Sequence, residues 1–200
     1  MYSVCSLNFN KHQMKKTISL TIVALLVNAS VYARTTIAAM TTEADAVTLE
    51  LVWSGIGKIF ANGILLNNGG SLETNTIAPN SEGKVILTAT EDALLTHLSC
   101  RSNRLTALDV SNCTALTMLD CYDNQLTALD VSNNTALMWL YCHWNQLTTL
   151  NLSNNPKLTH LYCGSNQLTA LDVSGNTALM YLHYDENQLT TLDVSSCTAL

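Results

Sequence analysis

A strict repeat of 21 residues constrains this chain more than any other feature of its sequence. The leading leucine of each unit recurs at that interval: Leu95, Leu116, Leu137, Leu158, Leu179 and Leu200. A period of this length is typical of solenoids, in which one unit cannot bury its apolar face alone and does so by stacking on its neighbours. The sequence therefore predicts a stack of coils over residues 95–200.

Each unit follows the template L-x-x-L-x-C-x-x-N-x-L-x-x-L-D-V-S-x-N-x-x, a leucine-rich-repeat pattern. One unit carries it at Leu116, Leu119, Cys121, Asn124, Leu126, Leu129, Asp130, Val131, Ser132 and Asn134. The short unit and its cysteine resemble the cysteine-ladder branch of the internalin-type bacterial surface proteins. The pattern is equally similar to leucine-rich-repeat surface proteins of gut Bacteroidetes, which carry a small β domain ahead of the repeats. The resemblance is strong over residues 95–200 and weak over residues 34–94.

The alternation of side chains along a strand assigns a place to each template position. Leu119 and Cys121 point inward from a short parallel strand, whereas residues 118, 120 and 122 point outward. The recurring asparagine is expected to satisfy backbone groups where each coil turns: Asn103, Asn124, Asn145, Asn166 and Asn187. The D-V-S-N-N segment favours extended backbone or a tight 3₁₀ turn over a helix. The predicted fold is a leucine-rich-repeat solenoid with parallel β-strands on its concave face.

Some positions depart from the template, and the sequence alone does not explain them. They are Tyr184 at the cysteine position, Asn151-Leu152 in place of Asp-Val, Pro156 in place of Thr, and Cys113 and Cys197 in place of Asn. The chain stops at Leu200, the first residue of a further unit. Because the last coil of a solenoid needs a cap, the sequence predicts truncation at the C-terminus.

Residues 1–33 are predicted to be a leader. After Met14, two lysines precede an apolar run over residues 18–27, and Val-Tyr-Ala at 31–33 forms a small-residue cleavage pattern. Translation is thus expected to start at Met14, and Arg34 to be the first mature residue. The run is shorter than the about 20 residues of a membrane-spanning helix. We therefore predict a cleaved signal peptide, no transmembrane segment, and a secreted or cell-surface protein; the alternative is a buried helix.

Residues 34–94 are predicted to form a small all-β module with a linker. Residues 47–53 alternate like a half-buried strand, with Trp53 as a core residue, and residues 84–90 form another strand. Asn62-Gly63 marks a hairpin turn between residues 58–61 and 64–66. The stretch 67–83 is polar and rich in Gly and Asn. The first coil of a solenoid exposes an apolar end, so the module is expected to cap it.

Six cysteines follow the leader, and their spacing predicts buried free thiols. Four occupy one repeat position: Cys100, Cys121, Cys142 and Cys163. Stacked about 4.8 Å apart with parallel side chains, they do not favour disulfide geometry. Cys113 and Cys197 share a second position four coils apart, about 19 Å at this spacing, which is too far for a bond. A one-dimensional ladder does not predict a tetrahedral zinc site either.

Charge excludes some partners. The composition is globular, with 48% hydrophobic and 12% charged residues. Removal of the leader, which holds three lysines, leaves six basic and fifteen acidic residues, a net charge of −9. Such an acidic chain is not expected to bind nucleic acid or an anionic membrane surface.

The units differ mainly at the outward strand positions, where aromatic residues gather. Neighbouring strands lie about 4.8 Å apart, so these rings are expected to form a nearly continuous platform. Rigid aromatic side chains are frequent hot spots of interfaces; the alternative is that the rings only cover one another. We call the following set the concave aromatic face: Met118, Asp120, Tyr122, Trp139, Tyr141, His143, Trp144, His160, Tyr162, Tyr181 and His183.

Catalysis, cofactors and metals are not predicted. His183 with Tyr162, or His143 with Asp120, would make acid–base pairs, but a catalytic site needs a pocket and this face is an open sheet. The histidines fall in different columns, which does not favour a metal site. A calcium ladder of the D-V-S aspartates is the alternative, but the glycine-rich nonapeptide that accompanies such ladders is absent from the sequence.

The function that these observations favour is binding. We expect an exported protein that binds another protein, such as a host surface protein, through the concave aromatic face in adhesion or host interaction. Two alternatives remain: the face binds a glycan, because aromatic rings also stack on sugars, or the repeats are a structural spacer for a further C-terminal domain.

Overall fold

The computed structural model describes residues 34–42, 47–54, 59–61, 64–65, 73–77, 79, 84–90 and 94–200. The predicted leader, the hairpin turn at Asn62-Gly63 and the side chain of Trp53 lie outside what is described. The described residues include no helix long and apolar enough to cross a membrane.

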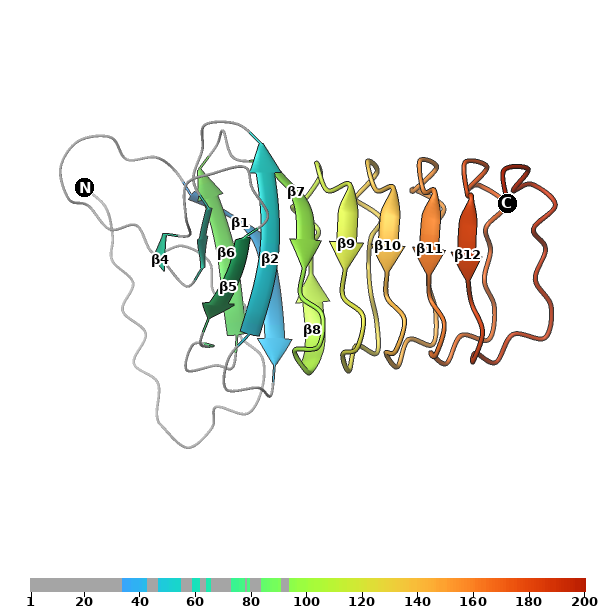
Figure 1. Cartoon of the computed structure of the whole chain (residues 1–200), viewed down its shortest axis with the longest axis horizontal. Helices are drawn as coiled ribbons and strands as arrows, with labels where there is room; N and C mark the ends of the chain where they lie inside the picture. Colours follow the sequence, from blue (N-terminus) through green and yellow to red (C-terminus); the bar gives the residue numbers. More distant parts are fainter. Residues whose placement is uncertain are drawn as a thin grey trace, which may run out of the picture. The chain divides into compact units, whose positions relative to one another are not determined.

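The repeats form the predicted parallel β-solenoid. Each unit contributes one strand to a shared sheet, and the strands lie side by side (Figure 1): β7 (Leu94–Ser99), β9 (Met118–Asp120), β10 (Trp139–Tyr141), β11 (His160–Tyr162) and β12 (Tyr181–His183). Adjacent strands are parallel, and each residue pairs with the one at the same template position, as Leu140 does with Leu119. The register of the sequence repeat is therefore the register of the sheet.

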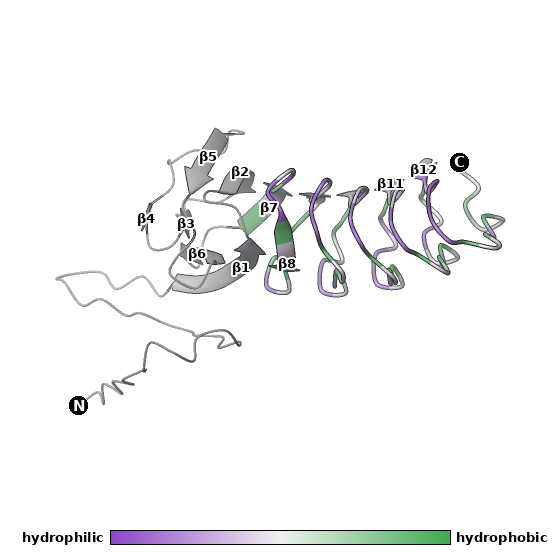
Figure 2. Ribbon diagram, turned by 90° about the horizontal axis from the view of Figure 1, so that it is seen from below, coloured by the Kyte–Doolittle hydropathy of each residue, from purple (hydrophilic) through white to green (hydrophobic). Residues whose placement is uncertain are grey.

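The core of the solenoid is a stack of leucine and cysteine layers. Leu119 and Cys121 point inward and are fully buried, as the alternation predicts. The leucines after the asparagine complete each layer, for example Leu126, and Val131 closes it from the far side. Figure 2 shows hydrophobic and hydrophilic stretches recurring from coil to coil. Burial of the same side chains in successive units is what holds the short strands together, since three residues alone form no stable strand.

The convex side consists of tight turns, as predicted for the D-V-S-N-N segment. In one coil the amide of Cys113 donates to the carbonyl of Val110 at 2.9 Å, and the amide of Leu116 donates to the carbonyl of Cys113 at 3.0 Å. These bonds join residues three apart, as in a 3₁₀ helix. The aspartate before each turn bonds to the backbone two residues later. For example, Asp109 Oδ1 accepts from the amide of Ser111 at 2.9 Å.

Asparagines at the end of the concave strands form what we call the concave-side ladder: Asn124, Asn145, Asn166 and Asn187. Asn145 shows their role: its Oδ1 accepts from the amide of Leu126 at 3.0 Å, and its Nδ2 donates to the carbonyls of Cys121 and Cys142 at 3.0 and 3.2 Å. One amide thus joins two coils. The predicted structural role of these asparagines is confirmed.

A second set of stacked residues, which we call the convex-side ladder, holds the convex turns: Cys113, Asn134, Asn155, Asn176 and Cys197. Asn155 Nδ2 donates to the carbonyls of Val131 and Asn134 in the preceding coil, at 3.1 and 3.0 Å. Cys197 makes corresponding contacts through its thiol, with Sγ 3.5 Å from the carbonyl oxygen of Val173 and 3.7 Å from that of Asn176. This explains the replacement of Asn by Cys at that position, because a thiol is also a donor.

The strands ahead of the repeats continue both sides of the first coil. They are β1 (Arg34–Thr42), β2 (Val47–Ser54), β3 (Ile59–Ala61), β4 (Ile64–Leu65), β5 (Glu73–Ile77) and β6 (Lys84–Thr90). β2 pairs antiparallel with β7, which extends the concave sheet to the order β12-β11-β10-β9-β7-β2-β5. β1 pairs antiparallel with β8 (Leu105–Asp109) and belongs to the order β4-β3-β6-β1-β8.

Two strands were not expected from the sequence. β5 lies inside the stretch 67–83, which was predicted only to be polar; it forms because β2 offers an edge, with Leu49 opposite Asn75. β8 occupies template positions that form no strand in the later coils, and here β1 supplies the partner, with Met40 opposite Leu108. In both cases an adjacent edge decides the conformation.

Candidate functional site

The outward side chains of the concave strands form columns of rings that stack from coil to coil. In the first column, the ring centroids of Trp139 and His160 are 6.0 Å apart, and those of His160 and Tyr181 are 4.5 Å apart at an interplanar angle of 20°. Met118 precedes them, paired with Trp139 in the sheet. The in-register pairing of the strands aligns these rings.

The second column is also aromatic. Tyr141 and Tyr162 stack at 5.0 Å and 27°, and Tyr162 and His183 stack at 5.7 Å and 23°. Burial, followed by the neighbouring Tyr162 and Asp120, raises the pKa of the Tyr141 hydroxyl above its usual value. The Tyr141 phenol therefore stays neutral in neutral solution and can act as a hydrogen-bond donor.

The third column contains a close pair of rings, and Trp144, one position further along the chain, stands beside it. Tyr122 and His143 stack at 4.6 Å and 9°, and Trp144 stands edge-on to both, with centroids 6.3 and 5.9 Å away. Trp144 is 57% exposed, and its backbone is left-handed with φ 54°. The same position is left-handed in other coils, at Asp123 and Glu186. The turn thus imposes a conformation that bulky residues adopt rarely, and here it displays an indole ring.

Gly164 interrupts the third column and makes room for a contact between His183 and Asp185. His183 Nδ1 lies 3.0 Å from Asp185 Oδ1. A Cβ at residue 164 would lie only 2.8 Å from that Nδ1. A side chain at this position would therefore push His183 out of the second column, so Gly164 is required for the contact between His183 and Asp185.

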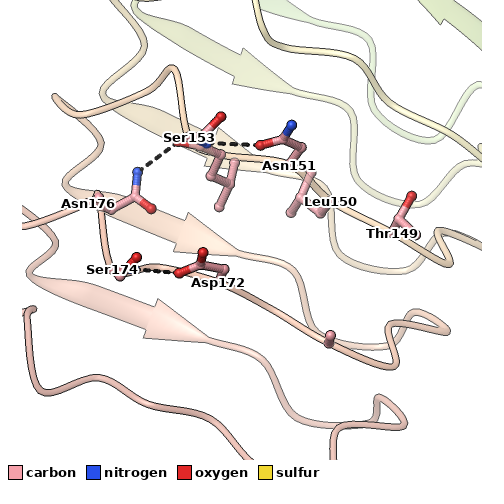
Figure 3. A pocket seen from close by; sticks show the side chains of 10 residues that line it. Thr149, Leu150, Asn151, Ser153, Asp172, Ser174 and Asn176 are labelled. Atoms are coloured by element: carbon pink, nitrogen blue, oxygen red, sulfur yellow. Dashed lines mark hydrogen bonds between the residues drawn. The ribbon is translucent and has the colours of Figure 1, made fainter.

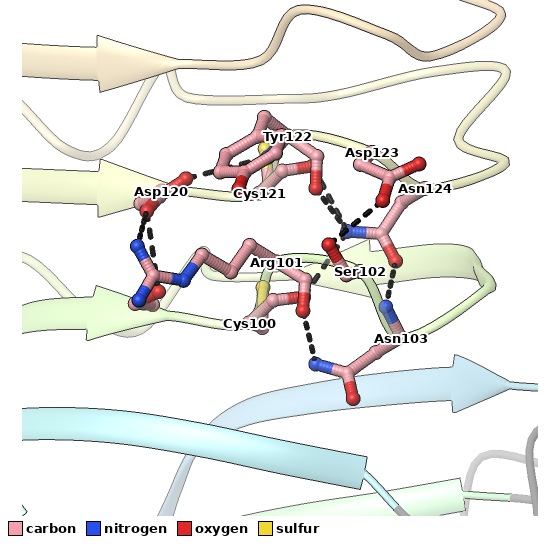
Figure 4. A network of polar contacts seen from close by, with 10 residues as sticks. Cys100, Arg101, Ser102, Asn103, Asp120, Cys121, Tyr122, Asp123 and Asn124 are labelled. Carbon is pink, nitrogen blue, oxygen red and sulfur yellow. Dashed lines mark hydrogen bonds and ion pairs between the residues drawn. The ribbon is translucent and has the colours of Figure 1, made fainter. Parts of the chain in front are cut away.

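Asp120 is the one member of the concave aromatic face that the structure buries, at 5% exposure. Its Oδ2 lies 3.8 Å from Arg101 Nη1 and accepts from Ser99 Oγ at 3.3 Å, while its Oδ1 accepts from the amide of Tyr122 at 3.4 Å (Figure 4). Asp120 points outward, as the sequence predicts, but its side chain is not exposed to solvent. Neighbouring side chains cover the carboxylate, which anchors the start of the face.

Most of the remaining face is half-buried. Met118, Tyr122, Trp139, Tyr141, His143, His160 and Tyr162 are half-buried, whereas Trp144, Tyr181 and His183 are exposed. The rings therefore cover one another in part and still present surface to solvent. Stacking fixes their orientation before any ligand arrives, which lowers the entropy that binding would lose.

The histidines of the face do not form the acid–base pairs considered from the sequence. His183 and Tyr162 stack face to face. Burial, followed by the nearby His183, lowers the pKa of His143, and its Nδ1 is buried with no hydrogen-bond partner among the described residues. Within the described part of the chain, no three His, Cys, Asp or Glu side chains converge to hold a metal ion.

All six cysteines of the repeats are buried and carry free thiols, as predicted. Burial raises the pKa of the Cys163 thiol to about 12, with Asp185 adding to the effect, and it likewise raises the pKa of Cys121 and Cys142. A thiol with so high a pKa is a poor nucleophile and metal ligand. These cysteines therefore act as small core residues.

Sequence reasoning left two residues out of the face, Arg101 and Asp185. Both belong to the third outward column, together with Tyr122 and His143, so template alignment alone placed them there. Arg101 pairs with Asp120, which lies two template positions earlier in the next coil, and Asp185 contacts His183, which lies two residues earlier in the same coil. Aligning charged residues across successive units is the signal that would find the pair of Arg101 and Asp120.

Comparison with known proteins agrees with this architecture. The family model described as LVIVD repeat matches residues 99–124, and no curated protein matches the chain. The solved structure "Functional domain of InlJ from Listeria monocytogenes includes a cysteine ladder" is 48% identical over 53% of this chain, with a TM-score of 0.53. The repeats form a leucine-rich-repeat solenoid that is similar to the one in InlJ.

This chain spans less than a third of either solved structure. The match spans 24% of the InlJ chain. A second solved structure, an internalin (InlF) from Listeria monocytogenes strain 4b F2365, is 28% identical over 45% of this chain and 28% of its own, with a TM-score of 0.43. What this chain shares with InlJ is therefore the solenoid and its cysteine ladder, and the roles of further regions do not transfer to it.

Proposed function

We propose that this chain is an exported internalin-type protein that binds another protein, such as a host surface protein, through the concave aromatic face, in adhesion or host interaction. The observation that carries the proposal is the set of stacked rings on strands β9 to β12. Rigid aromatic side chains make large contacts and lose little conformational entropy on binding.

The form of the face supports binding rather than catalysis. It is an open parallel sheet, and an enzyme needs a pocket in which polar groups converge. Its histidine and tyrosine rings stack on one another instead of pairing as donor and acceptor. A broad surface with fixed aromatic side chains suits a protein partner, whose own side chains fill the spaces between the rings.

The test is a binding screen with matched variants. Purified protein is applied to protein and glycan arrays beside the Trp139→Ala/Tyr141→Ala double variant, with urea unfolding to verify that the variant is folded. The control is Thr148→Ala/Lys157→Ala, which changes two exposed residues of the same unit outside the face. A protein hit that the first variant loses and the control keeps supports the proposal.

Other outcomes decide against it. A glycan hit that depends on Trp139 and Tyr141 assigns the face to carbohydrate instead. Binding that the double variant retains would show that the face does not bind the ligand. If neither array yields a ligand, the structural spacer is favoured.

We also propose that residues 34–94 cap the first coil and that residues 1–33 direct export. Pairing of β1 with β8 and of β2 with β7 supports the cap, as does Met40, which is 1% exposed within the repeat core. Export is tested by expressing the chain from Met14 in a secreting bacterium, where Arg34 is the expected N-terminus of the released protein. An intact leader on that protein would contradict the assignment.

A further inference from the structure

On the convex side, a contact that two coils share is not repeated in the two coils after them. In two successive coils an exposed asparagine reaches back to the coil before it: Asn133 Nδ2 donates to the carbonyl of Ser111, and Asn154 Nδ2 to that of Ser132, each at 3.2 Å. Gly175 stands at the same position one coil later. The carbonyl of Ser153 therefore receives no hydrogen bond from the described residues.

The missing side chain leaves space as well as an unsatisfied carbonyl. A Cβ placed on Gly175 would meet no atom within 4 Å. A pocket of about 400 Å³ opens at this place between two coils (Figure 3). Its lining includes Leu150, Asn151, Ser153 and Asp172. The pocket thus lies where the repeat departs from its template twice, at Asn151 and at Gly175.

Two acceptors in the pocket are suited to a cation. Besides the Ser153 carbonyl, it holds the exposed carboxylate of Asp172, whose pKa is lowered by hydrogen bonds from the side chain and amide of Ser174. Asn151 replaces the aspartate of the preceding coil and turns its Oδ1 to the amide of Ser153 at 3.1 Å. Leu150 and Ala170 add apolar surface. One negative charge, one vacant carbonyl and an apolar wall are therefore brought together.

We propose that this pocket binds an arginine side chain of a peptide partner. The guanidinium donates to the Asp172 carboxylate and to the Ser153 carbonyl, where it replaces the missing asparagine amide, and its aliphatic stem packs on Leu150 and Ala170. A planar fork of N–H donors suits two separated acceptors better than a point charge does. The acidic chain, with a net charge of −6, favours a cationic partner. The pocket does not depend on the concave aromatic face.

The first experiment titrates ¹⁵N-labelled protein with N-acetyl-arginine-N-methylamide and follows amide chemical shifts. We expect saturable shifts confined to residues 149–153 and 170–176, with a dissociation constant of the order of 1 mM, as suits a single exposed side chain. The neutral citrulline analogue is expected to bind at least about tenfold more weakly, a difference of about 1.4 kcal/mol. Equal shifts from both compounds, or shifts spread over the surface, would overturn the proposal.

Variants then separate this pocket from unspecific attraction. Gly175→Asn restores the bridge of the other coils and should abolish the shifts; the variant is expected to fold, because the space is open and asparagine occupies positions 133 and 154. Asp172→Asn should weaken binding at least about tenfold, the same 1.4 kcal/mol. Asn133→Gly, the control two coils away, should leave binding unchanged. Retention of arginine binding by Gly175→Asn would disprove the site.

Discussion

The two ladders that hold the turns of each coil use asparagine differently. In the concave-side ladder both polar atoms of the side-chain amide form hydrogen bonds. Asn145 Oδ1 accepts from the amide of Leu126, and Nδ2 donates to two carbonyls. In the convex-side ladder only the Nδ2 donor of the asparagine forms hydrogen bonds. Nδ2 of Asn155 makes two hydrogen bonds, whereas its Oδ1 is buried without a partner among the described residues.

The difference explains where the sequence tolerates replacement. Only asparagine occupies the concave-side ladder in the repeats, because no other side chain of that size both accepts and donates twice. The convex-side ladder begins and ends with cysteine, whose thiol supplies the donor alone. The choice of amino acid at a ladder position thus depends on how many hydrogen bonds its side chain must donate and accept. Burial alone does not limit that choice.

The largest expected effect is at the concave-side ladder. Asn145→Cys keeps a thiol donor but removes the oxygen that accepts from the buried amide of Leu126, and a buried group left unpaired costs about 1–3 kcal/mol. We expect the free energy of unfolding to fall by about 3 kcal/mol in urea titrations. A loss no greater than that of Asn155→Cys would remove the distinction between the ladders.

Alkaline pH tests the cysteine at the start of the convex-side ladder. Burial, followed by Asp109, raises the pKa of Cys113 to about 12, whereas an unfolded thiol titrates near about 8.5. The unfolded state therefore loses its proton first. The contribution to stability is complete below about pH 8.5 and declines as the pH rises towards 12.

The variant Cys113→Asn lacks this titration. Between pH 8 and pH 10 its free energy of unfolding should fall by about 1–2 kcal/mol less than that of the wild type. The measurement is urea unfolding of both proteins in a series of buffers. Parallel pH curves for the two proteins would show that Cys113 is accessible or already ionised in the folded state.

A smaller effect is expected at the centre of the convex-side ladder. Asn155→Cys keeps a donor near the same two carbonyls, as at Cys197, and removes a buried amide oxygen that has no partner. The free energy of unfolding should change by about 1 kcal/mol or less. A loss near that of Asn145→Cys would mean that Asn155 Oδ1 has a partner in solution, such as a bound water molecule.

The smallest effect is expected at the exposed turn beside this ladder. Asp130 Oδ1 accepts from the amide of Ser132 at 2.9 Å, and Asn151 already makes the same bond to Ser153 at 3.1 Å. Asp130→Asn should therefore change the free energy of unfolding by less than about 0.5 kcal/mol, as for most surface substitutions. Thermal unfolding of both proteins at low and high salt checks this prediction. A large loss of stability that depends on salt would indicate that the charge of Asp130 stabilises the fold.

The sequence predicted the structure correctly where a template position has the same structural role in every coil. Leu119, Cys121 and Asn124 lie where the period and the alternation of strand side chains place them. It failed where a residue depends on a neighbour that is not at the same template position. Asp120 is buried because Arg101 covers it, and residues 105–109 form a strand because β1 lies beside them.

The sequence by itself determined the solenoid, its parallel register, its thiol layer and its concave-side ladder, because a strict period makes every coil repeat the contacts of the last. Only the tertiary structure decided how the outward rings stack, why Gly164 is needed beside His183, and that Gly175 opens a pocket. These features depend on distances between side chains of different coils, and those distances exist only once the coils have stacked.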